Sequence, residues 1–268
     1  MTEFETVFIA GSPRLACDVA GSGELVVLLH GIGGQRQNWH DQLPVFADDF
    51  QVTAWDARGY GDSEDYEGPL DFADFSADLA RLLDHFGAAR AHIVGLSMGG
   101  RIAQDFYERE PQRVASLVLC NTFAGIAEVL APDQRAEFIR LRQEPLLAGG
   151  EPRDIAKGVA QSFAGPDVTE QQMARMVASM SALHKESYLK TIEATTNYDR
   201  TSELASFALP VLLVFGESDP LTPVTIGEGM QSRLPDSRLH VIPRAGHISN
   251  LEKPEEFNRV VLEFLRAQ

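Results

Sequence analysis

The sequence has little cysteine and no long apolar run. Its 268 residues include two cysteines, Cys17 and Cys120, which lie far apart, the second inside an apolar run. We expect both to be small buried side chains rather than a disulfide. No apolar run approaches the roughly 18 residues of a membrane span, and Met1–Thr6 lacks the basic and apolar regions of a signal peptide. The sequence therefore predicts a cytoplasmic protein without a membrane partner.

Basic residues are also scarce. The chain has 23 Lys and Arg against 39 Asp and Glu, a formal net charge of −16. This excess argues against nucleic acid or an anionic membrane as a partner. The charge is uneven, because residues 122–200 carry a net −2 and the remainder carries −14. A solvated acidic surface that aids solubility is the favoured interpretation. A nearly neutral middle that admits an anionic substrate is the alternative.

Short apolar segments alternate with helical patterns along most of the chain. Two of them, Leu25–Leu29 and Val211–Phe215, are apolar without alternation, as expected for strands buried on both faces. The other predicted strands are Val52–Trp55, His92–Leu96, Ala115–Cys120 and Arg238–Ile242. Helical spacing of apolar residues recurs over residues 75–86, 102–107 and 257–265. This alternation predicts an α/β fold with a doubly wound, mostly parallel sheet.

Residues 122–200 interrupt that alternation. They contain no strand pattern and at least two amphipathic helical patterns, around Ala136–Leu141 and Met173–Leu183. We therefore predict a helical cap over 122–200, inserted into a core domain formed by 1–121 and 201–268. The apolar stripe of the longer cap helix contains Met173, Met176 and Met180. We favour simple packing for this stripe, and a flexible wall over a pocket is the alternative.

The most informative motif is Gly95-Leu96-Ser97-Met98-Gly99-Gly100, where an apolar run gives way to a helical pattern. A strand-to-helix turn of this kind, the nucleophile elbow, strains the serine and exposes its hydroxyl. Glycines are needed on both sides, because a Cβ would clash in so sharp a turn. The motif makes Ser97 the candidate nucleophile.

Two further polar residues follow predicted strands. Asp219 comes after Val211–Phe215, and His247 comes after the last strand. A serine nucleophile needs a base and an acid that orients the base, and Ser97, Asp219 and His247 occur in the chain order of an elbow-type hydrolase. Glu217 is the nearest rival for the acid. The loop after Cys120 offers Asn121 rather than an acid.

Acyl transfer by a serine also needs backbone N–H donors for the oxyanion. We expect one from Met98, directly after the nucleophile, and one from Ile32, in the glycine-rich segment His30–Gly34. That segment lacks the G-x-G-x-x-G spacing of a dinucleotide site. No His, Cys, Asp or Glu cluster has metal-ligand spacing. We therefore expect neither a cofactor nor a metal.

These motifs resemble the α/β-hydrolase superfamily over nearly the whole chain. The resemblance rests on His30-Gly31, Trp55–Ser63, Gly95–Gly100, Gly216–Asp219 and Gly246-His247. A serine at the elbow, rather than an aspartate, points away from the haloalkane dehalogenase and epoxide hydrolase branches. Within the superfamily, three strings look like 3-oxoadipate enol-lactonases of aromatic degradation. They are residues 91–100, 117–122 and 247–252.

The resemblance implies a serine hydrolase that cleaves a small carboxylate-bearing enol-lactone or ester through an acyl-enzyme. A carbon–carbon bond hydrolase of ring-cleavage dienoates, a general carboxylesterase or perhydrolase, and a ligand receptor that retains the triad are the alternatives. The expected partners are a small-molecule substrate and water, with the chain as a monomer or homo-oligomer. The candidate cations for a substrate carboxylate are Arg140, Arg142, Lys157, Arg175, Lys185 and Lys190.

Overall fold

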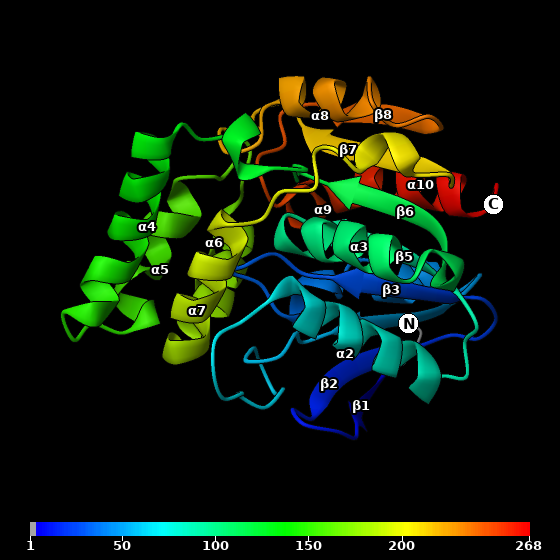
Figure 1. Ribbon diagram of the computed structural model, residues 1–268, viewed down its shortest axis with the longest axis horizontal. Helices are drawn as coiled ribbons and strands as arrows, with labels where there is room; N and C mark the ends of the chain where they lie inside the picture. Colours follow the sequence, from blue (N-terminus) through cyan, green and yellow to red (C-terminus); the bar gives the residue numbers. More distant parts are fainter. Residues whose placement is uncertain (1–3) are drawn as a thin grey trace.

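A computed structural model describes residues 4–268, and a twisted sheet forms their centre (Figure 1). The sheet has eight strands in the order β1-β2-β4-β3-β5-β6-β7-β8. Six of them run parallel, and β1 and β2 join the edge of β4 in antiparallel pairing. The strands are β1 Glu5–Ile9, β2 Leu15–Ala20, β3 Leu25–Leu29, β4 Gln51–Trp55, β5 Ala91–Leu96, β6 Val114–Cys120, β7 Val211–Gly216 and β8 Ser237–Ile242.

Helices cover both faces of this sheet. One apolar core includes residues of α2 (Phe72–His85), α3 (Met98–Arg109) and α8 (Val224–Gln231). The other includes residues of α1 (Leu43–Phe46) and α10 (Pro254–Leu265). The short α9 (Ser249–Glu252) directly precedes α10. The predicted doubly wound, mostly parallel architecture is therefore confirmed.

The six predicted strands correspond to β3 through β8, with bounds that differ by at most one residue at either end. The two antiparallel strands β1 and β2 escaped prediction. Their sequences mix polar and apolar residues, and β2 buries Asp18 among its apolar neighbours. Such a strand lacks the continuous apolar run by which the parallel strands can be predicted.

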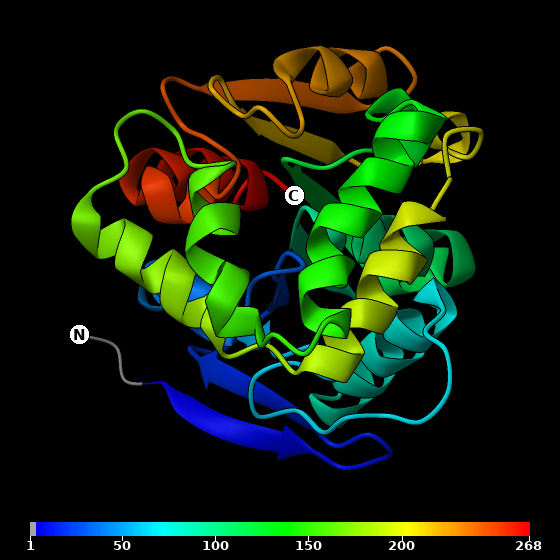
Figure 2. The same cartoon turned by 90° about the vertical axis from the view of Figure 1, so that its left-hand side faces the viewer.

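Four helices lie between β6 and β7 and pack beside one another at one end of the sheet (Figures 1 and 2). They are α4 Pro132–Leu147, α5 Pro152–Gln161, α6 Glu170–Ser181 and α7 Lys185–Thr196. The expected pattern Ala136–Leu141 falls within α4, the expected pattern Met173–Leu183 overlaps α6 and runs two residues past its end, and α5 and α7 are additional. We call these four helices and their connections the cap helices. They face the carboxyl ends of the parallel strands, where doubly wound folds form their binding sites (Figure 1).

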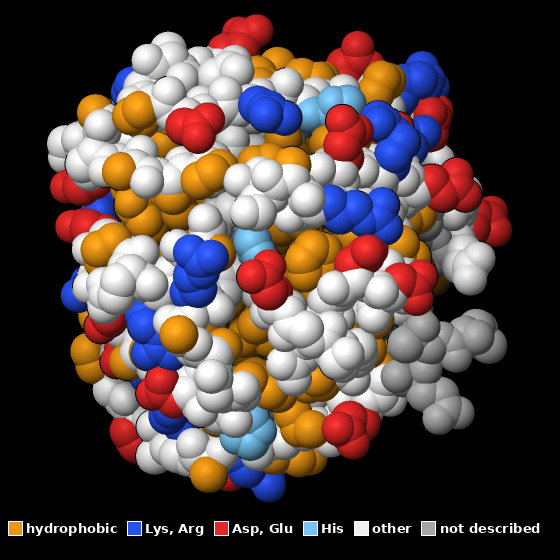
Figure 3. Space-filling view, turned by 90° about the vertical axis from the view of Figure 1, so that its right-hand side faces the viewer, with side chains coloured by type: hydrophobic (Ala, Val, Ile, Leu, Met, Phe, Trp, Pro, Cys, Tyr) orange, Lys and Arg blue, Asp and Glu red, His pale blue; other side chains and the backbone are white. Residues whose placement is uncertain are grey.

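On the face remote from the cap helices, acidic and basic side chains are interspersed rather than gathered by sign (Figure 3). Within residues 4–268, no helix combines the length and the apolar character needed to cross a membrane. Both cysteines are buried and free, as the sequence predicts. A cavity lined by Ser97 and His247 lies between the sheet and the cap helices.

Candidate active site

Ser97 occupies a strained turn between β5 and α3. Its φ of 53° and ψ of −110° lie outside the regions that non-glycine residues ordinarily adopt. The turn is tightly packed, because a Cβ on Gly95 would collide with the Gly99 carbonyl and a Cβ on Gly99 would collide with that of Leu29. The backbone geometry expected for a nucleophile elbow is thus present at the predicted position.

Asp219 and His247 meet at the ends of the two neighbouring strands β7 and β8. His247 Nδ1 lies 2.7 Å from Asp219 Oδ2, and both side chains are buried. Oδ2 also accepts hydrogen bonds from Asn121 Nδ2 at 2.8 Å and from the Thr222 hydroxyl. Oδ1 accepts from the Leu221 N–H at 2.8 Å. With Nδ1 directed at a carboxylate, His247 keeps Nε2 for another partner.

The surroundings of Asp219 keep it ionised. Burial by itself raises the pKa of this carboxyl, but the charge of His247 and the hydrogen bonds from His247 and Thr222 outweigh it. The net effect lowers the pKa of Asp219 below its usual value. The rival acid, Glu217, instead accepts a hydrogen bond from the Arg244 backbone N–H at 2.9 Å. Of the two carboxylates, Asp219 is the one bonded to His247.

The two backbone groups expected to bind an oxyanion lie on either side of Ser97. Met98 is the first residue of α3, so its N–H has no acceptor within the helix. Ile32 lines the same cavity as Ser97. The carbonyl of its peptide unit, that of Gly31, accepts from the Gly34 N–H at 2.9 Å and from His30 Nδ1 at 2.8 Å. These bonds fix the plane of the Gly31–Ile32 peptide, and with it the direction of the Ile32 N–H.

His30 performs this role as a neutral imidazole. Burial lowers its pKa, against the opposing effects of the Gly31 carbonyl and the Asp56 charge. Its Nε2 accepts a hydrogen bond from the Ala57 N–H at 3.1 Å, which leaves the proton on Nδ1 for Gly31. Sequence reasoning named the His30-Gly31 pair as a motif but gave the histidine no role.

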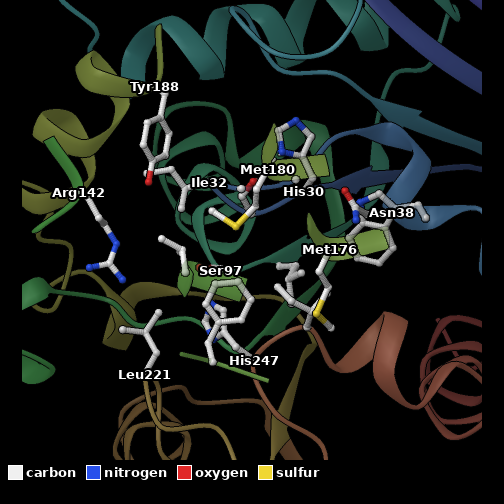
Figure 4. A pocket seen from close by; sticks show the side chains of 18 of the residues that line it. His30, Ile32, Asn38, Ser97, Arg142, Met176, Met180, Tyr188, Leu221 and His247 are labelled. Carbon is white, nitrogen blue, oxygen red and sulfur yellow. Dashed lines mark hydrogen bonds between the residues drawn. The ribbon is translucent and has the colours of Figure 1, made fainter. Parts of the chain in front are cut away.

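One cavity brings Ser97 and His247 together beneath the cap helices (Figure 4). It encloses about 710 Å³ of space between protein atoms, its solvent-open part included, which suits a small ligand. Its walls are mainly apolar and come from both the sheet loops and the cap helices. They include Ile32, Trp39, Leu96, Phe138, Val159, Phe163, Met176, Met180, Tyr188, Leu221 and Ile248.

Comparison with known proteins agrees with this arrangement. A family model described as the alpha/beta hydrolase fold matches residues 24–254. This chain belongs to the α/β-hydrolase fold family. It is 30% identical over 237 residues to 3-oxoadipate enol-lactonase 2 of Acinetobacter baylyi, with 88% of this chain and 86% of that relative covered. The predicted family and the predicted resemblance to enol-lactonases are confirmed.

Other relatives of this α/β-hydrolase are named for different activities. It is 32% identical over 264 residues to a 2-hydroxy-6-oxononadienedioate/2-hydroxy-6-oxononatrienedioate hydrolase of Burkholderia vietnamiensis, with 93% of this chain and 89% of the relative covered. Among solved structures, a hydrolase from Pseudomonas aeruginosa PA01 matches with a TM-score of 0.87 and 32% identity, covering 97% of this chain and 98% of that one. The family is therefore shared by enzymes with different substrates.

Arg142 is the candidate cap cation that lines the cavity (Figure 4). Its guanidinium carbon lies 3.6 Å from the centre of the Phe138 ring, and burial lowers its pKa. Within residues 4–268 it forms no ion pair. Other candidates are engaged elsewhere, with ion pairs or hydrogen bonds that join Arg140 to Glu137, Arg175 to Asp41, Lys185 to Glu151 and Lys190 to the Tyr66 carbonyl. Lys157 is exposed.

The methionine stripe of α6 serves both interpretations made from the sequence. Met176 and Met180 are buried in the core, and both also line the cavity (Figure 4). Met173 packs against the core from a partly buried position. All three methionines therefore pack against the core, and two of them, Met176 and Met180, also form part of the cavity wall.

Glu252 is a buried residue whose role the sequence did not indicate. Its Oε2 accepts from the Gly246 N–H at 2.7 Å and from the Gly165 N–H at 3.0 Å, and its Oε1 accepts from the Ile248 N–H at 3.1 Å. Gly246 and Ile248 flank His247, whereas Gly165 belongs to the connection between α5 and α6. Burial raises the pKa of Glu252, even though these three N–H groups lower it. The carboxylate thus joins the His247 loop to the cap helices.

We predict that Glu252→Gln lowers both stability and turnover. The amide has one acceptor oxygen instead of two, so at least one buried N–H loses its partner, at a cost of about 1–3 kcal/mol. The loop that carries His247 loosens, and kcat falls. Urea unfolding and steady-state kinetics measure the two effects. Glu263→Gln, an exposed residue of α10, is the matched control. Wild-type stability together with wild-type kcat in the Glu252 variant would show that this carboxylate does not position the loop.

Proposed function

We propose that this α/β-hydrolase is a serine hydrolase that cleaves a small carboxylate-bearing enol-lactone or ester through an acyl-enzyme. The observation that carries the proposal is that His247, hydrogen-bonded to Asp219, lines one cavity with the strained Ser97. This combination supplies a nucleophile, a base and a group that orients the base. The 30% identity to a 3-oxoadipate enol-lactonase supports the choice of substrate.

The first half of the reaction forms the acyl-enzyme. His247 Nε2 takes the proton of the Ser97 hydroxyl, and Asp219 stabilises the imidazolium that results. Ser97 Oγ attacks the lactone carbonyl, and the developing oxyanion accepts hydrogen bonds from the Ile32 and Met98 N–H groups. Collapse of the tetrahedral intermediate breaks the carbonyl–oxygen bond of the ring. The enolate oxygen leaves and takes up the proton from His247, and the enol becomes a ketone.

The second half releases the acid. A water molecule gives its proton to His247 and attacks the ester carbonyl of acylated Ser97. The same two N–H groups bind the second oxyanion, because the carbonyl has not moved. When the intermediate collapses, Ser97 Oγ recovers the proton and the carboxylic acid departs. The apolar cavity walls favour the small carbon skeleton of such a substrate.

Arg142 supports a substrate that carries a carboxylate. Its guanidinium is half-buried and has no anionic partner within residues 4–268, which is costly in an apolar cavity. A substrate carboxylate would supply that partner, and the planar guanidinium can bind it with two hydrogen bonds. The local cation also answers the objection that a chain of net charge −16 repels anions, because salt screens the distant charges.

The proposal is tested by following the absorbance of 3-oxoadipate enol-lactone. We expect wild-type enzyme to hydrolyse it with a kcat/KM in the usual range of about 10⁴–10⁸ M⁻¹s⁻¹. Ser97→Ala should lose about 10⁶-fold in kcat, by the precedent of serine proteases. Ser232→Ala, at an exposed serine, is the control. Slow lactone turnover that does not depend on Ser97 would refute the proposal.

A second prediction concerns Arg142. Arg142→Met should reduce kcat/KM for a carboxylate-bearing ester, relative to a neutral ester of the same length, by about tenfold to a hundredfold. The loss should be mainly in KM, since the carboxylate lies away from the reacting bond. Arg140→Met, on the same helix but exposed and paired with Glu137, should keep the wild-type ratio. Equal losses for the charged and the neutral ester would contradict this role.

Carbon–carbon bond hydrolysis of a ring-cleavage dienoate is a second candidate function. The observation that favours it is the 32% identity to the Burkholderia vietnamiensis hydrolase, over 264 residues. The same assay separates the two functions. Ser97-dependent cleavage of a dienoate, beside feeble turnover of the lactone, would select the second candidate.

A further inference from the structure

A second cavity is lined by both Ser97 and Arg101. It shares Ile32, Ser97, Phe138 and Leu221 with the main cavity, so the two meet at the candidate nucleophile. Its other walls come from the segment after β6 and from the end of α7. They are Phe123, Ile126, Val129, Leu130, Thr195 and Thr196. Arg101, one helical turn after Ser97 on α3, is the charged residue among those that line it.

Arg101 is a buried cation without a carboxylate partner within residues 4–268. Its exposed fraction is 5%, and its Nε is buried with no hydrogen-bond partner in the described part of the chain. Its Nη1 donates to the Thr195 carbonyl at 3.0 Å, and the guanidinium lies 4.5 Å from the centre of the Phe123 ring. Asp105, one turn further along α3, is paired with Arg109 instead, at 2.7 Å.

This environment leaves the charge of Arg101 only partly compensated. One carbonyl and one aromatic face do not replace an anion for a buried guanidinium. Burial lowers the pKa of Arg101 to about 10, which still leaves the side chain charged at neutral pH. The hydrogen bond to Thr195 accounts for Nη1 of Arg101, but it accounts neither for the unpartnered Nε nor for the charge of the guanidinium. Both are explained by an anion that enters the second cavity.

We propose that Arg101 forms a second anion subsite, which binds a carboxylate group of the substrate in the cavity that it lines. The inference rests on the proposed function, in which Arg142 binds a carboxylate in the main cavity. Because the two cavities meet at Ser97, one molecule can extend into both while its carbonyl lies at the nucleophile. The substrate class is then an ester or lactone with one carboxylate on each side of the scissile carbonyl, one carboxylate more than 3-oxoadipate enol-lactone, whose second carboxyl group forms the lactone.

Competitive inhibition by unreactive acids tests this subsite without knowledge of the substrate. Straight-chain dicarboxylates from succinate to azelate are compared with monocarboxylates of the same carbon number, against hydrolysis of neutral 4-nitrophenyl acetate. At the chain length that spans the two guanidinium groups, we expect the dicarboxylate to bind about tenfold or more tightly. Arg101→Met and Arg142→Met should each abolish that advantage. Arg101→Lys should retain part of it, since the charge remains.

Arg109→Met, on the same helix but half-exposed and paired with Asp105, is the matched control and should keep the full advantage. Circular dichroism and the thermal midpoint verify that each variant is folded, and the chain-length series on wild type needs no variant. An equal affinity for both kinds of acid at every length would overturn the proposal. An advantage that survives Arg101→Met would do so as well, and would leave Arg101 as a tether between α3 and α7.

The inhibition experiment tests the Arg101 subsite independently of whether the enol-lactone is a substrate. If the enol-lactone is not a substrate but the dicarboxylate advantage depends on Arg101, the lactone is rejected and the subsite stands. If the enol-lactone is hydrolysed but no dicarboxylate advantage exists, the subsite is rejected and the lactonase stands. Should 4-nitrophenyl acetate not be hydrolysed, calorimetric titration of the same acids gives the same comparison.

Discussion

The backbone of Ser97 is the constraint on which the rest of the site depends. A non-glycine residue at φ 53° and ψ −110° costs on the order of 1–3 kcal/mol, which the surrounding structure must offset. The Ser97 N–H donates to the Cys120 carbonyl at 2.8 Å, and the Ser97 carbonyl accepts from the Thr122 hydroxyl at 2.7 Å. Strand β6 therefore holds the turn after β5 in place. Held in this turn, Ser97 lines the cavity, and Met98 begins α3 directly after it.

His247, the proposed base, is held by a different part of the chain, and the connection between the cap helices α5 and α6 takes part in holding it. The His247 N–H donates to the Phe163 carbonyl at 2.9 Å, and the Phe163 ring lies 5.7 Å from the imidazole. Gln172 of α6 donates to the Leu251 carbonyl at 2.9 Å, and the Glu252 carboxylate accepts from the Gly165 N–H between α5 and α6. Phe163, which lines the cavity, thus also positions His247, the proposed general base. A cap that shifts on substrate binding would move both together.

The sequence predicts what depends on local pattern. Buried parallel strands are continuous apolar runs, and the elbow, Asp219 and His247 follow strands in a fixed order. Ion pairs and burial that arise only from the folded structure cannot be predicted from local sequence pattern. Strand β2 contains Asp18, whose charge is matched by Arg36 at 3.0 Å, so its pattern looks polar. Arg142 is one of six candidate cations in the sequence and becomes distinguishable only when the ion pairs of the others are known. Arg101 looks like an ordinary surface residue of a helix until its burial is seen.

Labelling with diisopropyl fluorophosphate tests the central claim, that Ser97 is a nucleophile activated by His247. The reagent phosphorylates activated serines and needs no knowledge of the natural substrate. The account predicts a single adduct, found by peptide mapping on residues that include Ser97, and a much slower reaction in His247→Gln. An adduct on another serine, or labelling of Ser97 at the same rate in the histidine variant, would contradict it.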